Sequence, residues 1–484
     1  MGASVLVGNV LKKYLPEILK KSLGDERVIV NWKERCDKSL DKNDNTLAEI
    51  IYVGGGNAYV AFTDLETYTK ATKDFLLEVY DKTVSIGIAS AYVETDFESG
   101  YEEQNKELLK RLSEAKGKIN RPIPAGNQPI TRASLLTGLP VVEQENGEAI
   151  SAEQVCKREA RNSSKSSENK FKEFDDLIRG NNNYLAVIHV DGNSCGKLIR
   201  GYSKANNWDE VVPKIREMSK RISELYKKAY CQTVNKLREF YKTSSYYNKN
   251  SELPHIKIIL DGDDITCVTA GQYGTSFAAE LLRAIEYFSQ DKNLYPFEYK
   301  ESSKLTACAG VTIFHSHYPF SAAYKMAEEC CSNAKSYMRR DGESMKSFID
   351  FHLHQSGAVT SLKSYRKEQY ETANGYLLNR PYCMSNESEY PLYSEFEGLM
   401  KEWVKIQNKE DEGNKPWPRS RLKVLYAAMV DDSKVAEVLA WCKSRGYILP
   451  VEIKDNEIDK KQYATFFDVL ELADTYENIS EGVI

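Results

Sequence analysis

Short apolar runs alternate with long amphipathic stretches between residues 184 and 351 of the chain. The runs have the length of β-strands, and in the stretches between them apolar residues recur every three to four positions, as on one face of a helix. The order βαββαβ with one further helix is that of a ferredoxin-like palm domain, which is an α+β fold. The pattern predicts strands over 185–190, on both sides of Gly262 and over 305–314, and helices over 208–241, 275–290 and 321–339.

Three aspartates stand where these apolar runs end. Asp191 directly follows the first run (LAVIHV), and Asp263 and Asp264 follow Gly262 between the two strands of the central hairpin. In a palm domain the first strand lies next to this hairpin, so we expect Asp191 to lie beside Asp263 and Asp264. Strand alternation puts His189 on the Asp191 face, and we expect that face to be open to a ligand or a partner domain.

Carboxylates gathered at one place repel one another, which favours a bound cation. Mg²⁺ relieves that repulsion and also positions a nucleoside triphosphate. The competing interpretation is that residues 261–264 (DGDD) form only a hairpin turn, because Asp and Gly are both favoured in turns. That interpretation suffices for the motif alone, but Asp191 at a matching strand end favours catalysis. The small residues Asn193 and Ser194 that follow are expected to leave backbone N–H groups available to phosphates.

The first third of the chain repeats the pattern more weakly. Residues 50–62 (IIYVGGGNAYVAF) indicate a strand, a turn and a strand, and the turn stands where the later hairpin has its aspartates. We therefore expect two palms, the first without carboxylates. Glycine allows a positive φ or the close approach of a ligand, so this turn is either a structural requirement or a contact for a second nucleotide. The elements expected after the turn are a helix over 65–80, a strand over 84–93 and a helix over 101–116.

Composition is that of a soluble globular protein. The chain has 484 residues, 41% hydrophobic and 28% charged, enough for about three domains. Its apolar runs are shorter than the roughly 20 residues that span a bilayer, and its ten cysteines form no C-x-x-C pair. We therefore expect a cytoplasmic protein without membrane association. The net charge of −5 argues against a broad nucleic-acid-coating surface. The expected domains are a first palm (1–155), a linker rich in Lys, Ser and Asn (156–183), a catalytic second palm (184–355) and a helical C-terminal domain (356–484).

The two-palm pattern resembles the large polymerase/cyclase subunit of type III CRISPR effector complexes and, more distantly, the diguanylate cyclases that share the palm. The family's Gly-Gly-Asp-Asp hairpin stands here as residues 261–264, with aspartate in place of the first glycine. Asp191 matches the family's metal-binding aspartate, and residues 306–314 and 327–340 match its glycine-centred strand and its Ala-Lys helix. No histidine precedes His189, so the His-Asp nuclease domain of many members is not expected.

The resemblance implies two Mg²⁺ or Mn²⁺ ions, ATP or other nucleoside triphosphates as substrates, and a cyclic or short linear oligoadenylate signal for antiviral defence as the product. CRISPR effector subunits and guide or target RNA are implied partners. Two alternatives stay open: a catalytically silent scaffold that binds RNA or protein, and a cyclic dinucleotide synthase that works as a dimer. Lys335 either faces the triphosphate or lies on a solvated helix face. The implied catalytic residues are Asp191, Asp263 and Asp264, the implied metal ligands are the same three and Gly192, and the implied nucleotide contacts are Gly192, Asn193, Ser194, Gly262, Lys335, Gly54, Gly55, Gly56 and Asn57.

Overall fold

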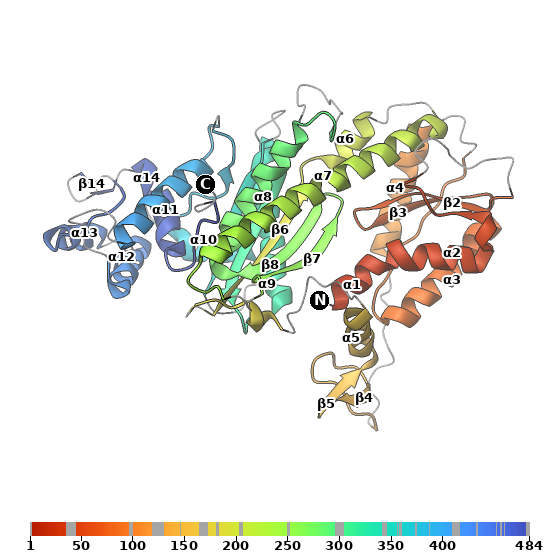
Figure 1. The fold of residues 1–484 in the computed structure, drawn as a ribbon, viewed down its shortest axis with the longest axis horizontal. Coiled ribbons are helices and arrows are strands. Elements are labelled where there is room, and N and C mark those ends of the chain that lie inside the picture. The colour runs from red at the N-terminus through yellow and green to blue at the C-terminus, as the bar shows by residue number, and fades with distance from the viewer. Residues whose placement is uncertain are drawn as a thin grey trace. The chain divides into compact units, whose positions relative to one another are not determined.

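The protein is described by a computed structural model, whose helices and strands are shown in Figure 1. The chain forms two compact units: Met1–Asn169 with Ser194–Glu224, and Lys170–Asn193 with Leu225–Ile484. No helix in the described ranges is both long enough and apolar enough to cross a membrane. The described residues are 2–34, 45–95, 100–118, 130–145, 147–163, 173–180, 183–202, 207–248, 252–295, 304–340, 346–355, 357, 361–372, 375–386, 388–408, 417–431, 434–451, 453–454, 457–458 and 460–480.

A six-stranded sheet forms the core of the second unit. Its strands are β6 (Tyr184–Gly192), β7 (His255–Asp261), β8 (Asp264–Ala270), β9 (Ala307–His315), β10 (Phe348–His354) and β13 (Tyr382–Cys383). The sheet order is β13-β10-β9-β6-β8-β7. The four strands β9-β6-β8-β7 have the ferredoxin-like order, which confirms the predicted palm topology. β6 runs antiparallel to both of its neighbours, and β10 extends the sheet parallel to β9.

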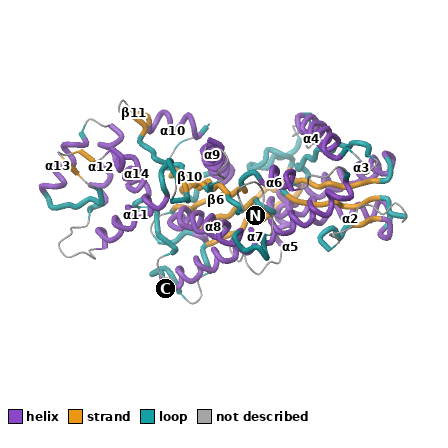
Figure 2. Tube along the Cα trace, turned by 90° about the horizontal axis from the view of Figure 1, so that it is seen from above, coloured by secondary structure: helices purple, strands orange, loops and turns teal. Residues whose placement is uncertain are grey.

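Two helices cover opposite faces of this sheet (Figure 2). Helix α8 (Gly274–Ser289) approaches so closely that a Cβ on Gly274 would lie 2.3 Å from the Cβ of Ala186. Helix α9 (Phe320–Arg340) does the same on the other face, where a Cβ on Gly310 would lie 2.0 Å from the backbone oxygen of Ala327. Glycine at these two positions is therefore a packing requirement.

The expectation that the Asp191 face is open was wrong for most of its length. Gly310 pairs with His189 in the β6–β9 ladder, so α9 covers the face that carries His189 and Asp191. The reason is topological: β9 and β10 are parallel, and a parallel connection must cross over one face of the sheet with its helix. Only the end of the strand stays accessible, and there the side chain of Asp191 is 40% exposed.

The C-terminal part is mainly helical, as predicted. A buried ion pair joins it to the sheet, between Arg366 and Asp350 of β10 at 2.7 Å, and a second lies within it, between Arg380 and Glu471 at 2.6 Å. A charge left alone in the interior is costly, so these pairs hold the helices firmly in place. The helices are α10 (Leu362–Tyr370), α11 (Tyr393–Asn408), α12 (Arg419–Asp431), α13 (Val435–Ser444) and α14 (Lys460–Leu472).

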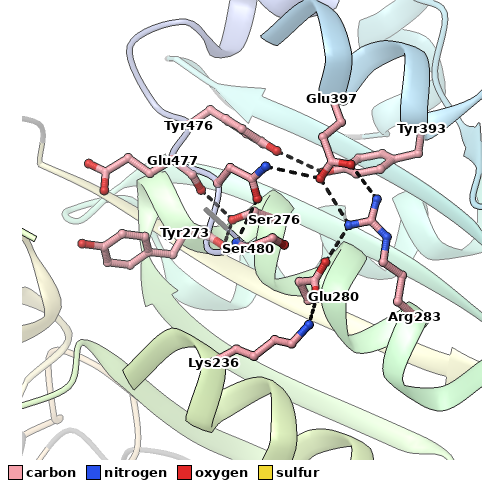
Figure 3. A network of polar contacts seen from close by, with 11 residues as sticks. Lys236, Tyr273, Ser276, Glu280, Arg283, Tyr393, Glu397, Tyr476, Glu477 and Ser480 are labelled. Atoms are coloured by element: carbon pink, nitrogen blue, oxygen red, sulfur yellow. Dashed lines mark hydrogen bonds and ion pairs between the residues drawn. The ribbon is translucent and has the colours of Figure 1, made fainter. Parts of the chain in front are cut away.

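A second polar network connects α11 and the last described residues to α8 (Figure 3). Arg283 bonds Glu280 at 2.6 Å and Glu397 at 2.7 Å, and Ser276 Oγ donates to the backbone oxygen of Glu477 at 2.6 Å. The network lines a cavity of about 620 Å³. Because these charged groups already bond one another, we interpret the network as structural.

The first unit contains the predicted hairpin and the predicted helices on either side of 84–93. Its three-stranded sheet has the order β1-β2-β3, with β1 parallel to β2 and β2 antiparallel to β3. Arg216, from the first part of helix α7, is buried and bonds Glu49 of β2 at 2.7 Å. The elements are α1 (Gly2–Asn9), a π-helix (Val10–Tyr14), α2 (Leu15–Leu23), β1 (Val28–Ile29), β2 (Ala48–Gly54), β3 (Asn57–Phe62), α3 (Leu65–Thr83), α4 (Tyr101–Gly117), β4 (Val141–Glu145), β5 (Glu148–Ser151), α5 (Ala152–Ser163), α6 (Cys195–Tyr202) and the start of α7 (Trp208–Thr243).

One local prediction in the first part of the chain was wrong. Residues 84–93 form no strand. Ile86 and Ile88 instead pack against the apolar core of this unit, so burial without strand pairing explains the apolar positions. The linker expected over 156–183 begins inside α5, and its residues 164–172 and 181–182 lie outside the described residues. The domain boundaries themselves stay a prediction.

Candidate functional site

Asp191 and Asp264 face each other across two neighbouring strands. In the antiparallel ladder of β6 and β8, Asp191 is the register partner of Asp264, and Asp261 of β7 pairs with Asp264 from the other side. The side chains of directly opposed residues point to the same face of a sheet. The predicted adjacency of Asp191 to the hairpin is therefore confirmed. The catalytic role of these residues stays a prediction.

The hairpin turn accounts for the position of Asp263. Gly262 and Asp263 form the two-residue connection between β7 and β8, and Gly262 has a φ of 63°. A glycine with positive φ at the first central position is typical of a type II′ hairpin. The motif is thus a genuine turn, and the strand that leaves it begins with Asp264, the register partner of Asp191.

The carboxyl group of Asp264 lies in an unfavourable electrostatic environment. Its side chain is 38% exposed, but Oδ1 is buried and accepts no hydrogen bond from the described part of the chain. Burial, followed by the negative charges of Asp191 and Asp263, raises the pKa of Asp264 to about 7. His189 Nδ1 lies 3.6 Å away, but burial lowers the pKa of His189, so this ring does not supply a balancing positive charge near neutral pH.

Lys335 of α9 places a positive charge at this strand end. Its Nζ lies 2.5 Å from Asp191 Oδ2 and donates to the backbone oxygen of Gly192 at 3.1 Å. Burial alone lowers the pKa of Lys335, but the hydrogen bond and the charge of Asp191 outweigh burial and raise it. With a side chain only 16% exposed, Lys335 does not lie on a solvated helix face, and that alternative is wrong.

Asn193 has a structural role that the sequence did not indicate. Its side chain is buried and its Nδ2 donates to Thr306 Oγ1 at 2.9 Å and to the backbone oxygen of Lys346 at 3.1 Å. Its backbone N–H donates to the oxygen of Thr306. The expectation that this N–H is available to a phosphate is therefore wrong. Ser194, with a φ of 56°, begins α6 by accepting a bond from the N–H of Leu198.

Two residues of α9 near the carboxylates were missed in the sequence. The negative charge of Glu328 contributes to the raised pKa of Asp264, and burial together with Glu328 raises the pKa of Tyr324. The ring of Tyr324 lies edge-on to His189, with centroids 5.8 Å apart. Residues 324, 328 and 335 recur at intervals of four and seven, which places them on one helix face. That spacing is the signal that could have identified them.

The corresponding turn of the first unit contains no carboxylate. Gly55 and Gly56 connect β2 and β3 with φ values of 57° and 69°, and Gly54 pairs with Asn57. Positive φ at both central positions is typical of a type I′ hairpin, so the need for glycine is confirmed there. Asn57 Nδ2 donates to the backbone oxygen of Gly55 at 2.8 Å. The nucleotide contact expected for Gly54–Asn57 stays a prediction.

The carboxylates beside Lys335 fit a divalent cation by their chemistry. In the described ranges, no three His, Cys, Asp or Glu side chains are gathered closely enough to hold a metal ion. The buried Oδ1 of Asp264, which accepts no hydrogen bond from any described residue, and the facing carboxylate of Asp191 nevertheless provide the hard oxygen donors that Mg²⁺ or Mn²⁺ prefers. Asp191, Gly192, Asp263 and Asp264 thus remain the predicted ligands.

Comparison with known families identifies the palm. Residues 184–343 match the second palm domain of Cas10/Cmr2. This part of the chain is therefore similar to that palm domain, as the resemblance implied. A comparison with curated proteins finds no match.

Several solved structures are similar to the chain at low sequence identity. They include the Csm1-Csm4 cassette in complex with pppApA (13% identity, TM-score 0.47) and the same cassette in complex with cA3 (14% identity, TM-score 0.48). A third is Csm1 in T.onnurineus (13% identity, TM-score 0.42). Each match covers 97% of this chain, but the chain spans only 66%, 66% and 64% of the respective relatives.

Proposed function

We propose that the second palm joins nucleoside triphosphates in a reaction that depends on divalent metal ions and releases pyrophosphate. ATP is the proposed substrate, and a cyclic or short linear oligoadenylate is the proposed product. The observation that carries the proposal is the facing pair Asp191 and Asp264, beside Lys335, within a domain similar to the second palm of Cas10/Cmr2. A fold alone would not support an activity, but these side chains supply the groups that the chemistry needs.

The reaction forms one bond and breaks another at the α-phosphorus of a triphosphate. The 3′-hydroxyl oxygen of one nucleotide attacks this phosphorus, the bond from it to the bridging oxygen of the β-phosphate breaks, and pyrophosphate leaves while the hydroxyl proton passes to solvent. Two bound Mg²⁺ or Mn²⁺ ions would supply charge stabilisation at the attacking and departing oxygens. Asp191, Asp263 and Asp264 would hold them, with the backbone oxygen of Gly192 as a further ligand.

The remaining predicted contacts divide between the donor and the acceptor nucleotide. Lys335 has a cationic end near the strand end and is proposed to bind the triphosphate of the donor. Gly192 and Ser194 follow Asp191 and Gly262 precedes Asp263, and these three stay proposed contacts. The Gly54–Asn57 turn of the first unit is proposed to hold the acceptor, because it lacks carboxylates that would repel a phosphate.

A place in a type III CRISPR effector complex forms part of the proposal. The match of residues 184–343 to the second palm of Cas10/Cmr2 supports it. Other effector subunits and guide or target RNA are the proposed partners, and antiviral defence is the proposed context. Purification of the chain together with its neighbouring gene products would test this assembly separately from the chemistry.

Mass analysis of products tests the chemistry. The protein is incubated with each labelled nucleoside triphosphate and either Mg²⁺ or Mn²⁺. We expect 3′–5′ linked adenylates from ATP. A two-nucleotide cyclic product alone would favour the cyclic dinucleotide synthase. The complete lack of product, together with the lack of metal-dependent nucleotide binding, would overturn the enzyme proposal in favour of a scaffold.

A further inference from the structure

Lys335 contacts the same atoms that a metal ion would need. Its Nζ lies 2.5 Å from Asp191 Oδ2 and 3.1 Å from the backbone oxygen of Gly192. A carboxylate and a backbone carbonyl are donor types that Mg²⁺ takes from proteins. Both residues are also metal ligands expected from the sequence. The ammonium group therefore lies where a divalent cation would make its first contacts with β6.

The ammonium group balances only part of the charge at this place. Asp191 is compensated by Lys335, whereas Asp264, its register partner, keeps a buried Oδ1 that accepts no hydrogen bond from the described residues. A divalent cation carries twice the charge of an ammonium group and accepts several oxygen ligands at once. A divalent cation would bind both facing carboxylates, whereas Lys335 is paired with Asp191.

We propose that Lys335 is a positioning residue that takes the place of a divalent cation on Asp191 in the metal-free protein and leaves Asp191 when the metal binds. This proposal rests on the metal-dependent function proposed above. Lysine suits such an exchange because it carries a compact charge on a flexible four-carbon stem. The displaced ammonium group then takes the triphosphate as its new partner. Binding of the metal thereby prepares Lys335 for the nucleotide.

If Lys335 competes with the metal ion for Asp191, removing its charge should raise the affinity of the protein for the metal. Mn²⁺ binding is measured by the loss of the electron paramagnetic resonance signal of aqueous Mn²⁺, without nucleotide, for the wild type, Lys335→Met and Lys335→Arg. We expect Lys335→Met to bind Mn²⁺ about tenfold more tightly, the lower end of what one charge within a few ångströms does to an ionic equilibrium. Lys335→Arg, which keeps the charge, should bind Mn²⁺ nearly as the wild type does. At saturating Mn²⁺, Lys335→Met should bind a non-reactive ATP analogue more weakly.

A matched control separates this exchange from a general effect of charge. Lys325 lies on the same helix, is 64% exposed and pairs with Glu329 at 3.9 Å. Lys325→Met removes one positive charge without touching Asp191, so its Mn²⁺ affinity should stay that of the wild type. Thermal unfolding with and without Mn²⁺ verifies folding, and Lys335→Gln replaces Lys335→Met if the latter does not fold.

The outcomes distinguish this proposal from the proposed function. Mn²⁺ affinity that is unchanged or weaker in Lys335→Met, an equal tightening in Lys325→Met, or no Mn²⁺ binding in any variant would each overturn the exchange. The predicted change in Mn²⁺ affinity without any nucleotide joining would support the exchange and overturn the enzyme proposal. If the wild type joins nucleotides but Lys335→Met leaves the Mn²⁺ affinity unchanged, the enzyme proposal is supported and the exchange is overturned.

Discussion

The hairpins β2–β3 and β7–β8 both have two-residue turns, but only the second carries aspartates at its turn. The first turns through Gly55 and Gly56, both with positive φ. The second turns through Gly262 and Asp263, and only Gly262 has a positive φ. In each hairpin, glycine supplies the positive φ that the turn requires. A tight turn therefore explains the glycines of both hairpins, and the first hairpin shows that such a turn needs no carboxylate.

The aspartates of the second hairpin are thus additional to the fold. Their negative charges repel one another. Burial, followed by the charges of Asp191 and Asp263, raises the pKa of Asp264 to about 7. Repulsion of this kind reduces the stability of a protein without a cation. Perturbed carboxylates in a charged cluster are typical of functional sites. This difference between the hairpins supports the proposal that the second hairpin holds the metal and the catalytic residues and that the first binds a nucleotide.

Removal of the hairpin carboxylates should have the largest effect. In Asp263→Asn with Asp264→Asn, pyrophosphate release should fall by at least about a hundredfold, because even outer partners of metal ligands contribute ten- to a hundredfold. Folding should be intact or slightly more stable, since repulsion is removed. Asp25→Asn, at an aspartate whose side chain is 74% exposed, is the control. Full activity in the double variant would remove the distinction between the two hairpins.

A bulky residue in the first hairpin should abolish one of two nucleotide sites. Gly55→Val places a β-branched residue at a φ of 57°, which costs about 1–2 kcal/mol of stability. Titration calorimetry with a non-reactive ATP analogue and Mn²⁺ should count two sites in the wild type and one in the variant, with joining suppressed. Gly147→Val, at a φ of 84°, imposes similar strain elsewhere and should keep both sites. A single site in both the wild type and Gly55→Val, with normal product formation, would make the first hairpin structural only.

Loss of Lys335 should affect nucleotide binding more than the chemical step. Lys335→Ala should raise the apparent KM for ATP about tenfold and lower kcat less, the pattern of a lost ground-state contact. Steady-state kinetics at saturating Mn²⁺ measures both constants. An unchanged KM would mean that Lys335 pairs with Asp191 and does not bind the triphosphate.

The last predicted effect concerns stability and pH and not nucleotide joining. In the folded metal-free protein the pKa of Asp264 is about 7, whereas an unfolded aspartate has a pKa of about 4. Between these values the folded state binds more protons, so the free energy of unfolding should fall as the pH rises from about 4 to about 7. The difference in this free energy between the wild type and Asp264→Asn, measured with urea in EDTA, isolates this group. A difference that does not depend on pH would show that Asp264 is not perturbed.

The sequence predicted the palm because its signals are local and strong. Strand-length apolar runs, helical periodicity and aspartates at strand ends indicated both the topology and the pairing of Asp191 with the hairpin. The role of Asn193 was not predictable in this way, because its partner Thr306 lies 113 positions away in the sequence. Residues 84–93 were misassigned as a strand because apolar positions can be satisfied by packing alone. The covering of the Asp191 face follows from the parallel pairing of β9 and β10, which a strand pattern does not reveal.

Pyrophosphate release from ATP, followed while EDTA-stripped protein is titrated with Mn²⁺, tests the central claim most directly. The account predicts no release without the metal, release that rises as Mn²⁺ is bound, and none at any Mn²⁺ concentration in Asp191→Asn. Release that persists in EDTA, or a wild type that binds both Mn²⁺ and ATP and still forms no pyrophosphate, would contradict it.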